Sequence, residues 1–347
     1  MNVTEHQRPG VYSVYDASSA VSGRTSGRAV GVAAISAKGK VGEVNVFHSY
    51  EEALGVYTPK ETMSELVSLL FQNGAAQVYA VSVAHSEETD TLLENYKAAF
   101  GLLEKVEDLA VVLCDSENTA VQKALQESVK SAAESRRERL AVIFGGEEES
   151  ASQLVQRAKA VNCERVVLVA PGGVKAAAAV AGAIAGESDP AVPLGGAELK
   201  GLDSLDTDWS DNEIDTLVLG GVTPLEQVGG TVSVVRGITT RTKTGTANDA
   251  TWRELTTIRV VDDVIPSLRS ALRAKFSRAK NTAQGRGAIR SQVIVELESK
   301  VANEIITGYQ DVAVSALPDD PTVCLVEFKF TVAHGLNQIW LSAHITV

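Results

Sequence analysis

The middle of the chain repeats one pattern, in which short continuous apolar runs alternate with longer stretches of helical spacing. The apolar runs are residues 78–84, 109–115, 139–146, 165–173 and 216–222. Between the first four runs, apolar side chains recur at helical intervals over residues 89–106, 118–135 and 150–160. Continuous apolar strands that alternate with helices are typical of a parallel sheet covered on both faces. We therefore predict an α/β domain.

The chain before this domain predicts a smaller α+β region. Residues 29–37 and 42–49 are predicted strands, and residues 59–74 are a predicted helix with a glycine at its end. Beyond the fourth apolar run, residues 187–215 are rich in acidic side chains, and we expect a loop there.

The last third of the chain predicts helices followed by strands. Residues 252–262 are predicted as a strand that leads into a helix over about residues 263–280, and a second helix over about 288–307 is expected to end at Gly308. The first helix carries apolar side chains on one face, namely Ile265, Leu268, Leu272, Phe276 and Ala279, and basic side chains on the other. After a turn, residues 322–333 alternate as a strand does. The pattern favours an α+β domain with two helices and a β-hairpin.

Both ends of the chain also alternate apolar and polar residues. Residues 338–347 place five apolar side chains on one face of a predicted strand and contain no charged side chain. Residues 8–28 open on a Pro–Gly pair, pass through a short alternating stretch and continue in small polar residues. A terminal strand without charge needs a sheet partner, because exposed edges are normally blunted by charge or proline. The partner is either a neighbouring copy or the chain itself, and the residues alone favour neither.

Composition places the chain among ordinary globular proteins. Its 347 residues, of which 44% are hydrophobic, suffice for two or three packed units. The longest weakly polar run, residues 174–186, contains Lys175 and is shorter than the roughly 18 to 20 residues of a bilayer span. The N-terminus lacks a secretion signal, so we expect a protein made and kept in the cytoplasm. Cys114, Cys163 and Cys324 are expected to pack as small apolar residues.

The net charge of −12 is unevenly distributed along the chain. Residues 236–300 carry 13 basic and 6 acidic side chains, although the rest of the chain is acidic. Basic segments bind nucleic acid in some proteins, but this one lacks interleaved aromatic residues and a known module signature. A solvated helix face is the commoner interpretation. A third is that acidic and basic surfaces of identical subunits meet head to tail.

An enzyme is the alternative function. Ligands of α/β sheets bind at the carboxyl ends of strands, and three predicted strands end in Gly145–Gly146, Gly172–Gly173 and Gly220–Gly221. None of these pairs forms GxGxxG, and the chain has no GxxxxGK[ST], so tight turns are the favoured interpretation. No histidine lies between residues 86 and 333, and no clustered metal ligands such as HExxH occur. We expect no catalytic residue, cofactor or metal.

Four stretches resemble the tail sheath proteins of contractile phage tails and related contractile injection systems. They are residues 8–12 (RPGVY), 221–242, 258–276, and an ending in which residues 306–312 (ITGYQDV) precede two alternating strands. The resemblance runs through most of the chain and is strongest over residues 215–347. It implies that the middle α/β domain has a subtilisin-like fold without protease activity, and the missing histidines agree with that.

The function implied by this resemblance is mechanical. Sheath subunits stack as hexameric rings into a helical tube around an inner tail tube, and then shift to a shorter, wider state that drives the tube into a target cell. The implied partners are further copies of the chain, the inner tail tube protein, and baseplate and tail terminator proteins, with no nucleic acid and no membrane insertion. The implied location is a virion tail or tail-like particle, assembled in the cytoplasm of the producing bacterium.

The resemblance also implies two arms that reach neighbouring subunits. The N-terminal arm residues are Pro9, Gly10, Val11, Tyr12, Val14 and Tyr15, and those of the C-terminal arm are Ile339, Trp340, Leu341, Ala343, Ile345 and Val347. We predict further contacts between Arg269, Arg273, Lys275 and Arg278 of the basic helix and Asp208 and Asp211 of a neighbour. The expected domains are an N-terminal arm (1–28), a small α+β region (29–85), the middle domain (86–235), a C-terminal sheath domain (236–337) and a C-terminal strand (338–347).

Overall fold

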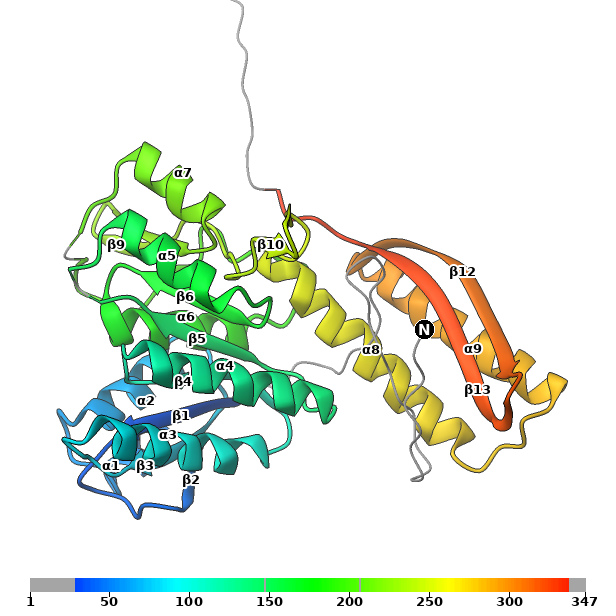
Figure 1. The fold of residues 1–347 in the computed structure, drawn as a ribbon, viewed down its shortest axis with the longest axis horizontal. Helices are drawn as coiled ribbons and strands as arrows, with labels where there is room; N and C mark the ends of the chain where they lie inside the picture. Colours follow the sequence, from blue (N-terminus) through cyan, green and yellow to red (C-terminus); the bar gives the residue numbers. More distant parts are fainter. Residues whose placement is uncertain (1–28, 147, 206, 337–347) are drawn as a thin grey trace, which may run out of the picture. The chain divides into compact units, whose positions relative to one another are not determined.

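The computed structural model describes residues 29–146, 148–205 and 207–336. These residues form two compact units (Figure 1). The first, here the sheet unit, contains the described residues from 29 to 188, from 192 to 256 and from 334 to 336. The second, here the hairpin unit, contains residues 189–191 and 257–333. The chain passes between the units inside helix α8 (Leu255–Phe276).

The sheet unit is built on one sheet, which within the described residues has nine strands in the order β2-β3-β1-β4-β5-β6-β8-β9-β7. The strands are β1 (Ala29–Ile35), β2 (Val44–Phe47), β3 (Gln77–Val83), β4 (Leu109–Cys114), β5 (Leu140–Phe144), β6 (Val166–Ala170), β7 (Glu198–Leu199), β8 (Thr223–Val228) and β9 (Thr231–Val234). The pairs from β3 to β8 are parallel, whereas β2, β9 and β7 pair antiparallel. The predicted α/β architecture is confirmed.

Helices cover both faces of this sheet. They are α1 (Tyr50–Leu54), α2 (Thr62–Gln72), α3 (Thr89–Glu104), α4 (Thr119–Glu134), α5 (Ala151–Val161), α6 (Gly173–Gly186) and α7 (Asp211–Leu219). Side chains of α3, α4, α5 and α7 share one apolar core with the strands, while α2 packs against α6. Every residue of β5 and β6 is buried, because a parallel sheet of this kind has no solvent face.

The alanine-rich helix α6 is buried because it packs unusually close to α2. A Cβ atom added at Gly182 would lie 2.8 Å from the Leu70 carbonyl oxygen, and one at Gly186 would lie 2.9 Å from Gly74 Cα. The two backbones lie so close together at these positions that only glycine fits between them. The run that the sequence shows as weakly polar is therefore a core helix. No helix among the described residues combines the length and apolar character that a bilayer span requires.

The hairpin unit combines two helices with two long strands. Helices α8 and α9 (Ala283–Ala302) contribute side chains to one apolar core, and β12 (Ile306–Leu317) pairs antiparallel with β13 (Asp320–Val332). The core side chains are Val260, Val264, Ile265, Leu268, Val293, Leu297, Ile306 and Phe328. The two helices and the β-hairpin expected of the C-terminal domain are therefore present. A smaller hairpin, β10 (Lys243–Thr244) with β11 (Ala247–Asn248), belongs to the sheet unit.

Two predicted strands are wrong. Residues 252–262 contain no strand, because α8 already begins at Leu255 and residues 255–261 are all buried. Thr256, Thr257 and Arg259 are buried together with the apolar side chains around them, so burial here does not follow one helix face and the order of apolar positions does not distinguish a helix from a strand. Residues 216–222 are also not a strand, since α7 occupies Asp211–Leu219 and the strand begins only at Thr223.

Several predicted helix ends are also corrected. Helix α8 ends at Phe276 rather than at residue 280, which places Arg278 beyond the helix. Helix α9 begins at Ala283, where the Thr282 hydroxyl accepts from Gly285 N at 3.1 Å as a side-chain cap. It ends at Ala302, and Gly308 lies inside β12 instead of stopping the helix.

Candidate functional site

The hairpin of β12 and β13 presents two open strand edges. Within the described residues, these strands pair only with each other, so each has one edge of backbone N–H and C=O groups without a strand partner. Strands of 12 and 13 residues are long for a two-stranded sheet, and such a sheet is only marginally stable unless packing supports it. Long open edges are sites at which another strand adds.

The two edges of this hairpin differ in regularity. Strand β12 carries one extra residue between Ile306 and Gly308 and another between Gln310 and Ala313, where Asp311 has a φ of 56°. These interruptions are β-bulges. Between Cys324 and Val332, β13 has no extra residue of its own, and its irregularity is confined to the turn end. The edge of β13 is therefore the longer regular one.

An ion pair is buried beneath this hairpin. The Lys300 ammonium of α9 donates to the Asp263 carboxylate of α8, and their side chains are 14% and 8% exposed. Burial raises the pKa of Asp263, and the hydrogen bond from Lys300 partly offsets this rise. The Ser267 hydroxyl also donates to the Asp263 carbonyl at 2.7 Å, one residue after Pro266 removes a helical N–H. The ion pair joins α8 to α9, and the Ser267 hydrogen bond lies within α8.

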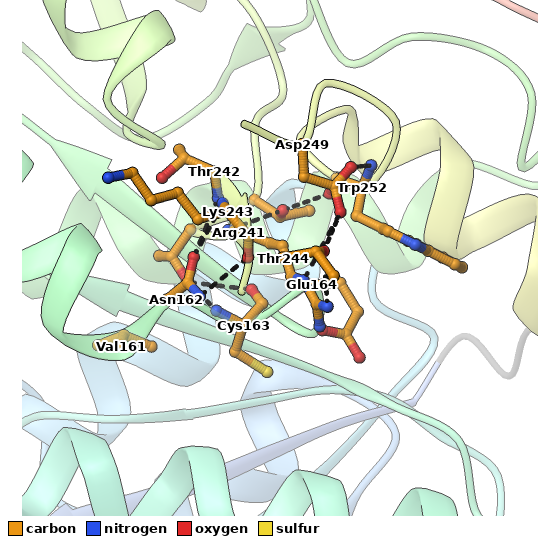
Figure 2. Close-up of polar contacts among 12 residues, drawn as sticks. Val161, Asn162, Cys163, Glu164, Arg241, Thr242, Lys243, Thr244, Asp249 and Trp252 are labelled. Atoms are coloured by element: carbon orange, nitrogen blue, oxygen red, sulfur yellow. Dashed lines mark hydrogen bonds and ion pairs between the residues drawn. The ribbon is translucent and has the colours of Figure 1, made fainter. Parts of the chain in front are cut away.

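A polar network in the sheet unit holds the segment that leads into α8 (Figure 2). Asn162 ends α5 in the left-handed conformation, with φ 41°. Its side-chain amide accepts from the backbone N–H groups of Thr242 and Lys243 at 3.1 and 3.2 Å, and donates to the Lys243 carbonyl at 3.1 Å. The amide thus makes hydrogen bonds of the kind that a neighbouring strand would make to the backbone at the start of β10.

Arg241 is the charged centre of this network. Its guanidinium donates to Glu164 at 2.7 Å and to the Thr244 hydroxyl at 3.0 Å, and lies 3.9 Å from Asp249. Burial alone raises the pKa of Glu164, but hydrogen bonds from its own backbone N–H and from Arg241 outweigh burial and lower it. Asp249 in turn accepts from the backbone N–H of Trp252 at 3.1 Å. The network thus anchors residues 239–252 just before α8 begins.

Two of the glycines at the carboxyl ends of the parallel strands are closely packed. A Cβ at Gly145 would lie 2.1 Å from Leu154 Cδ2, and one at Gly172 would lie 2.7 Å from the Ala176 Cβ. Gly220 follows helix α7 and does not end a strand, which corrects its predicted place. Among the residues that the structure describes, no three His, Cys, Asp or Glu side chains form a group suited to a metal ion.

Asp115 is a half-buried carboxylate at one of these strand ends. It follows β4, and its oxygens accept from the Tyr96 hydroxyl at 2.5 Å and from Ile35 N at 2.9 Å. Burial raises the pKa of Asp115, and these two hydrogen bonds oppose the rise. Burial and the neighbouring Asp115 also raise the pKa of Tyr96. The contacts tie β1, β4 and α3 together.

The predicted charge contacts are only partly available at the surface. Arg273 and Arg278 are exposed, Arg269 is half-buried, and the exposed Lys275 donates to Gln292 of the same unit at 2.5 Å. Asp208 and Asp211 are exposed in the sheet unit, where Asp211 opens α7. The predicted arms, residues 1–28 and 338–347, and all twelve of their contact residues lie outside the described residues. The contact between Arg273 and an acidic neighbour stays a prediction.

Comparison with known proteins decides the family. The family model "Phage tail sheath protein central domain" matches residues 93–240, and "Phage tail sheath C-terminal domain" matches residues 247–346. The chain belongs to the phage tail sheath family. A curated relative, the tail sheath protein of Bacillus phage SP01, is 29% identical over 254 residues, which are 68% of this chain and 43% of the relative. The match thus spans less than half of that sheath protein's length.

Solved structures of other proteins share the fold. A chain from the baseplate of the anti-feeding prophage has a TM-score of 0.74 at 17% identity, and covers 99% of this chain and 100% of its own. A chain from the contracted helical sheath of the same particle has a TM-score of 0.71 at 15% identity, with coverage of 98% and 99%. The sheath tail protein of Desulfitobacterium hafniense has a TM-score of 0.68 at 13% identity, covering 96% and 99%.

Sequence reasoning missed both the polar network and the bulges of β12. Asn162 and Lys243 lie 81 residues apart, and no local pattern relates them. The bulges did leave a signal, since the side chains of β12 that reach the core, Ile306, Tyr309 and Val312, recur at intervals of three instead of two. A half-buried strand is expected to alternate with a period of two, so this interval of three does not identify β12 as a strand in the sequence.

Proposed function

We propose that this sheath-family chain polymerises as a helical tube of hexameric rings around an inner tail tube, and that the tube contracts to drive the inner tube into a target cell. Its partners are then further copies of itself, the inner tube protein, and baseplate and tail terminator proteins. The tube assembles in the cytoplasm of the producing bacterium and resides in a virion tail or tail-like particle. The work is mechanical and needs no catalytic residue or cofactor.

The observation that carries this proposal is the pair of open edges on the β12–β13 hairpin, in a chain of the sheath family. Main-chain pairing at a strand edge gives affinity, and the alternate side chains give specificity. The alternating stretches near the two ends of the sequence, of which residues 338–347 carry no charged side chain, are suited to pair with such edges in neighbouring copies. One structural relative, the anti-feeding prophage sheath, is a helical sheath in a contracted state, and this likeness supports the same assembly for this chain.

Contraction requires an interface with two stable arrangements and a barrier between them. Arms that stay paired while the bodies of the subunits move would keep the tube continuous. We assign the changing contacts to the exposed Arg273 and Arg278, which meet Asp208 and Asp211 of a neighbour in one state. Charged contacts suit this role because exposed pairs contribute only about 0.2 to 1 kcal/mol each, so they exchange readily.

Truncation of the chain after Asn337 tests the proposal. We expect a folded, soluble protein whose thermal unfolding matches that of the full chain but which forms no rings or tubes. An internally paired C-terminal strand would give the opposite result, since its removal would lower the unfolding temperature. A truncated chain that still forms tubes would show that this strand does not join the subunits.

A further inference from the structure

We infer that three asparagines, Asn73, Asn162 and Asn281, close strand edges of this protein against pairing with a second copy of the chain. Each side-chain amide binds backbone groups of an edge strand, or of the residue next to one, that a further strand would otherwise bind. This role is separate from the proposed polymerisation, because it prevents contacts between copies instead of making them.

Asn73 covers the sheet edge at β7. It caps the C-terminal end of α2, and its amide accepts from Lys200 N at 2.8 Å and donates to the Lys200 carbonyl at 2.9 Å. Lys200 directly follows β7, which is the last strand of the nine-stranded sheet within the described residues. A Cβ added at Gly201 would lie 2.6 Å from Gln72 Oε1, so the end of α2 lies against this backbone. A strand from another copy would have to displace the amide.

Asn162 covers the small hairpin in the same way (Figure 2). Strand β10 pairs with β11 through Lys243 and Thr244. The amide of Asn162 binds both the N–H and the carbonyl of Lys243, at 3.2 and 3.1 Å. The two contacts have the form of a strand pair, so the side chain occupies the place that a third strand would take beside β10.

Asn281 covers the start of β13. It lies between α8 and α9, and its amide donates to the carbonyls of Pro321 and Val323 at 2.8 and 3.2 Å. Residues two apart in a strand point the same way, so both carbonyls lie on one side of β13. Arg286 donates to the amide oxygen of Asn281 at 2.9 Å and thereby orients its N–H groups towards the strand.

The residues at the three covered edges are themselves of kinds that discourage pairing. Lys200, Lys243 and Pro321 are all exposed. Lysine and proline are the residues that commonly blunt an exposed sheet edge, and proline also lacks the N–H that a new strand would need. Strand β2, at the opposite edge of the large sheet, is only four residues long, which also limits pairing. An amide and a blunting residue therefore coincide at each of the three edges.

Asn73→Ala tests the inference, and Asn303→Ala is its matched control. Both asparagines cap a helix with nearly the same backbone, at φ −101° and −92°, and each donates to the carbonyl four residues earlier. Asn73 additionally binds Lys200. At a temperature where both full-length variants are folded, sedimentation velocity should show more self-association in Asn73→Ala, and microscopy should show irregular aggregates.

A second control separates this effect from lost stability. Tyr96→Phe removes the hydrogen bond between α3 and Asp115, which follows the central strand β4, and so leaves the covered edges intact. We expect it to associate no more than the unmodified chain under the same conditions. If Asn73→Ala associates no more than Asn303→Ala or than Tyr96→Phe, the inference is overturned.

Crosslinking locates the association. Two full-length variants share Lys200→Cys and Cys324→Ser, and one of them also carries Asn73→Ala. The remaining cysteines, Cys114 and Cys163, are 1% and 2% exposed and do not compete. Pairing of two identical edges about a two-fold axis brings residue 200 of one copy close to residue 200 of the other. A short bismaleimide should therefore give covalent dimers in the variant with Asn73→Ala alone. Dimers in both variants, or in neither, would overturn the inference.

Discussion

The side-chain amide of Asn162 pairs with both backbone groups of Lys243, accepting from its N–H at 3.2 Å and donating to its carbonyl at 3.1 Å. This contact ties the end of α5 to a segment more than 80 positions further along the chain, just before α8. Asn162 also adopts the left-handed conformation at the end of α5. Its backbone therefore ends the helix, while its side chain binds the distant segment.

Asn162→Gly isolates the contribution of this amide. Glycine keeps the left-handed backbone without strain, so the variant loses only the hydrogen bonds, and we expect the free energy of unfolding to fall by about 1 to 3 kcal/mol. Amide hydrogen exchange of residues 242–244 should accelerate. Glu304→Gly is the control, since Glu304 is exposed with φ 58° and its substitution reports the backbone effect alone. Equal losses in both variants would contradict the role of the amide.

Lys300→Met should be strongly destabilising. It leaves the Asp263 carboxylate buried without its cation, which costs about 3 to 5 kcal/mol of unfolding free energy. The control is Lys329→Met, because Lys329 and Asp311 also pair, at 2.7 Å, but both side chains are 65% exposed. That change should cost less than about 1 kcal/mol. Urea titrations of the two variants measure the difference, and similar midpoints would refute the argument.

The loss in Lys300→Met should also depend on pH. Burial already raises the pKa of Asp263 in the folded protein, and loss of Lys300 raises it further. A carboxyl with a raised pKa binds its proton more tightly in the folded state, so stability falls as pH rises through the interval between the unfolded and folded pKa values. The variant should therefore be closest to the unmodified protein in acid and furthest from it near neutrality. Unfolding midpoints from about pH 4 to pH 8 check this trend.

Tyr96→Phe should destabilise the sheet unit by about 1 to 3 kcal/mol, because it leaves an oxygen of the half-buried Asp115 carboxylate without the hydroxyl that donates to it. The matched control is Tyr79→Phe, whose hydroxyl donates to Gln77 at 3.3 Å in a half-buried setting. We expect a loss of less than about 1 kcal/mol there. Thermal unfolding of both variants provides the comparison. A larger loss in Tyr79→Phe would show that the Asp115 contact is not the stabilising one.

Arg273→Glu tests the predicted charge contacts. Arg273 is exposed near the end of α8, so its reversal should change the free energy of unfolding by less than about 0.5 kcal/mol. Polymerisation or contraction should be impaired, as measured by light scattering and microscopy. Lys123→Glu, an exposed charge reversal on α4, serves as the control and should behave like the unmodified chain. If Arg273→Glu forms tubes that contract normally, then Arg273 is not part of the interface.

The central sheet was predictable because its strands are buried on both faces and therefore appear as continuous apolar runs. The same rule failed at residues 216–222, where the end of α7 is equally apolar. There the stronger signal was Ser210 followed by Glu213, whose side chains form a capping box at the start of α7. Attention to caps as well as to apolar runs would have found this helix.

The contacts that connect distant segments could not be predicted in the same way. Nothing near Asn162 in the sequence indicates that its amide binds Lys243, and nothing near Asp263 indicates Lys300. Such pairs are set by tertiary packing, which brings residues together irrespective of their local pattern. The basic side of α8 shows the same limit, because nothing near Lys275 in the sequence indicates that its ammonium donates to Gln292 of the same unit.

Negative-stain electron microscopy of the purified full-length protein tests the central claim most directly. A subunit whose terminal strands pair with the open edges of neighbouring copies should form rings or tubes without any other protein. Discrete particles of single-chain size, at every concentration and salt condition tried, would contradict the account.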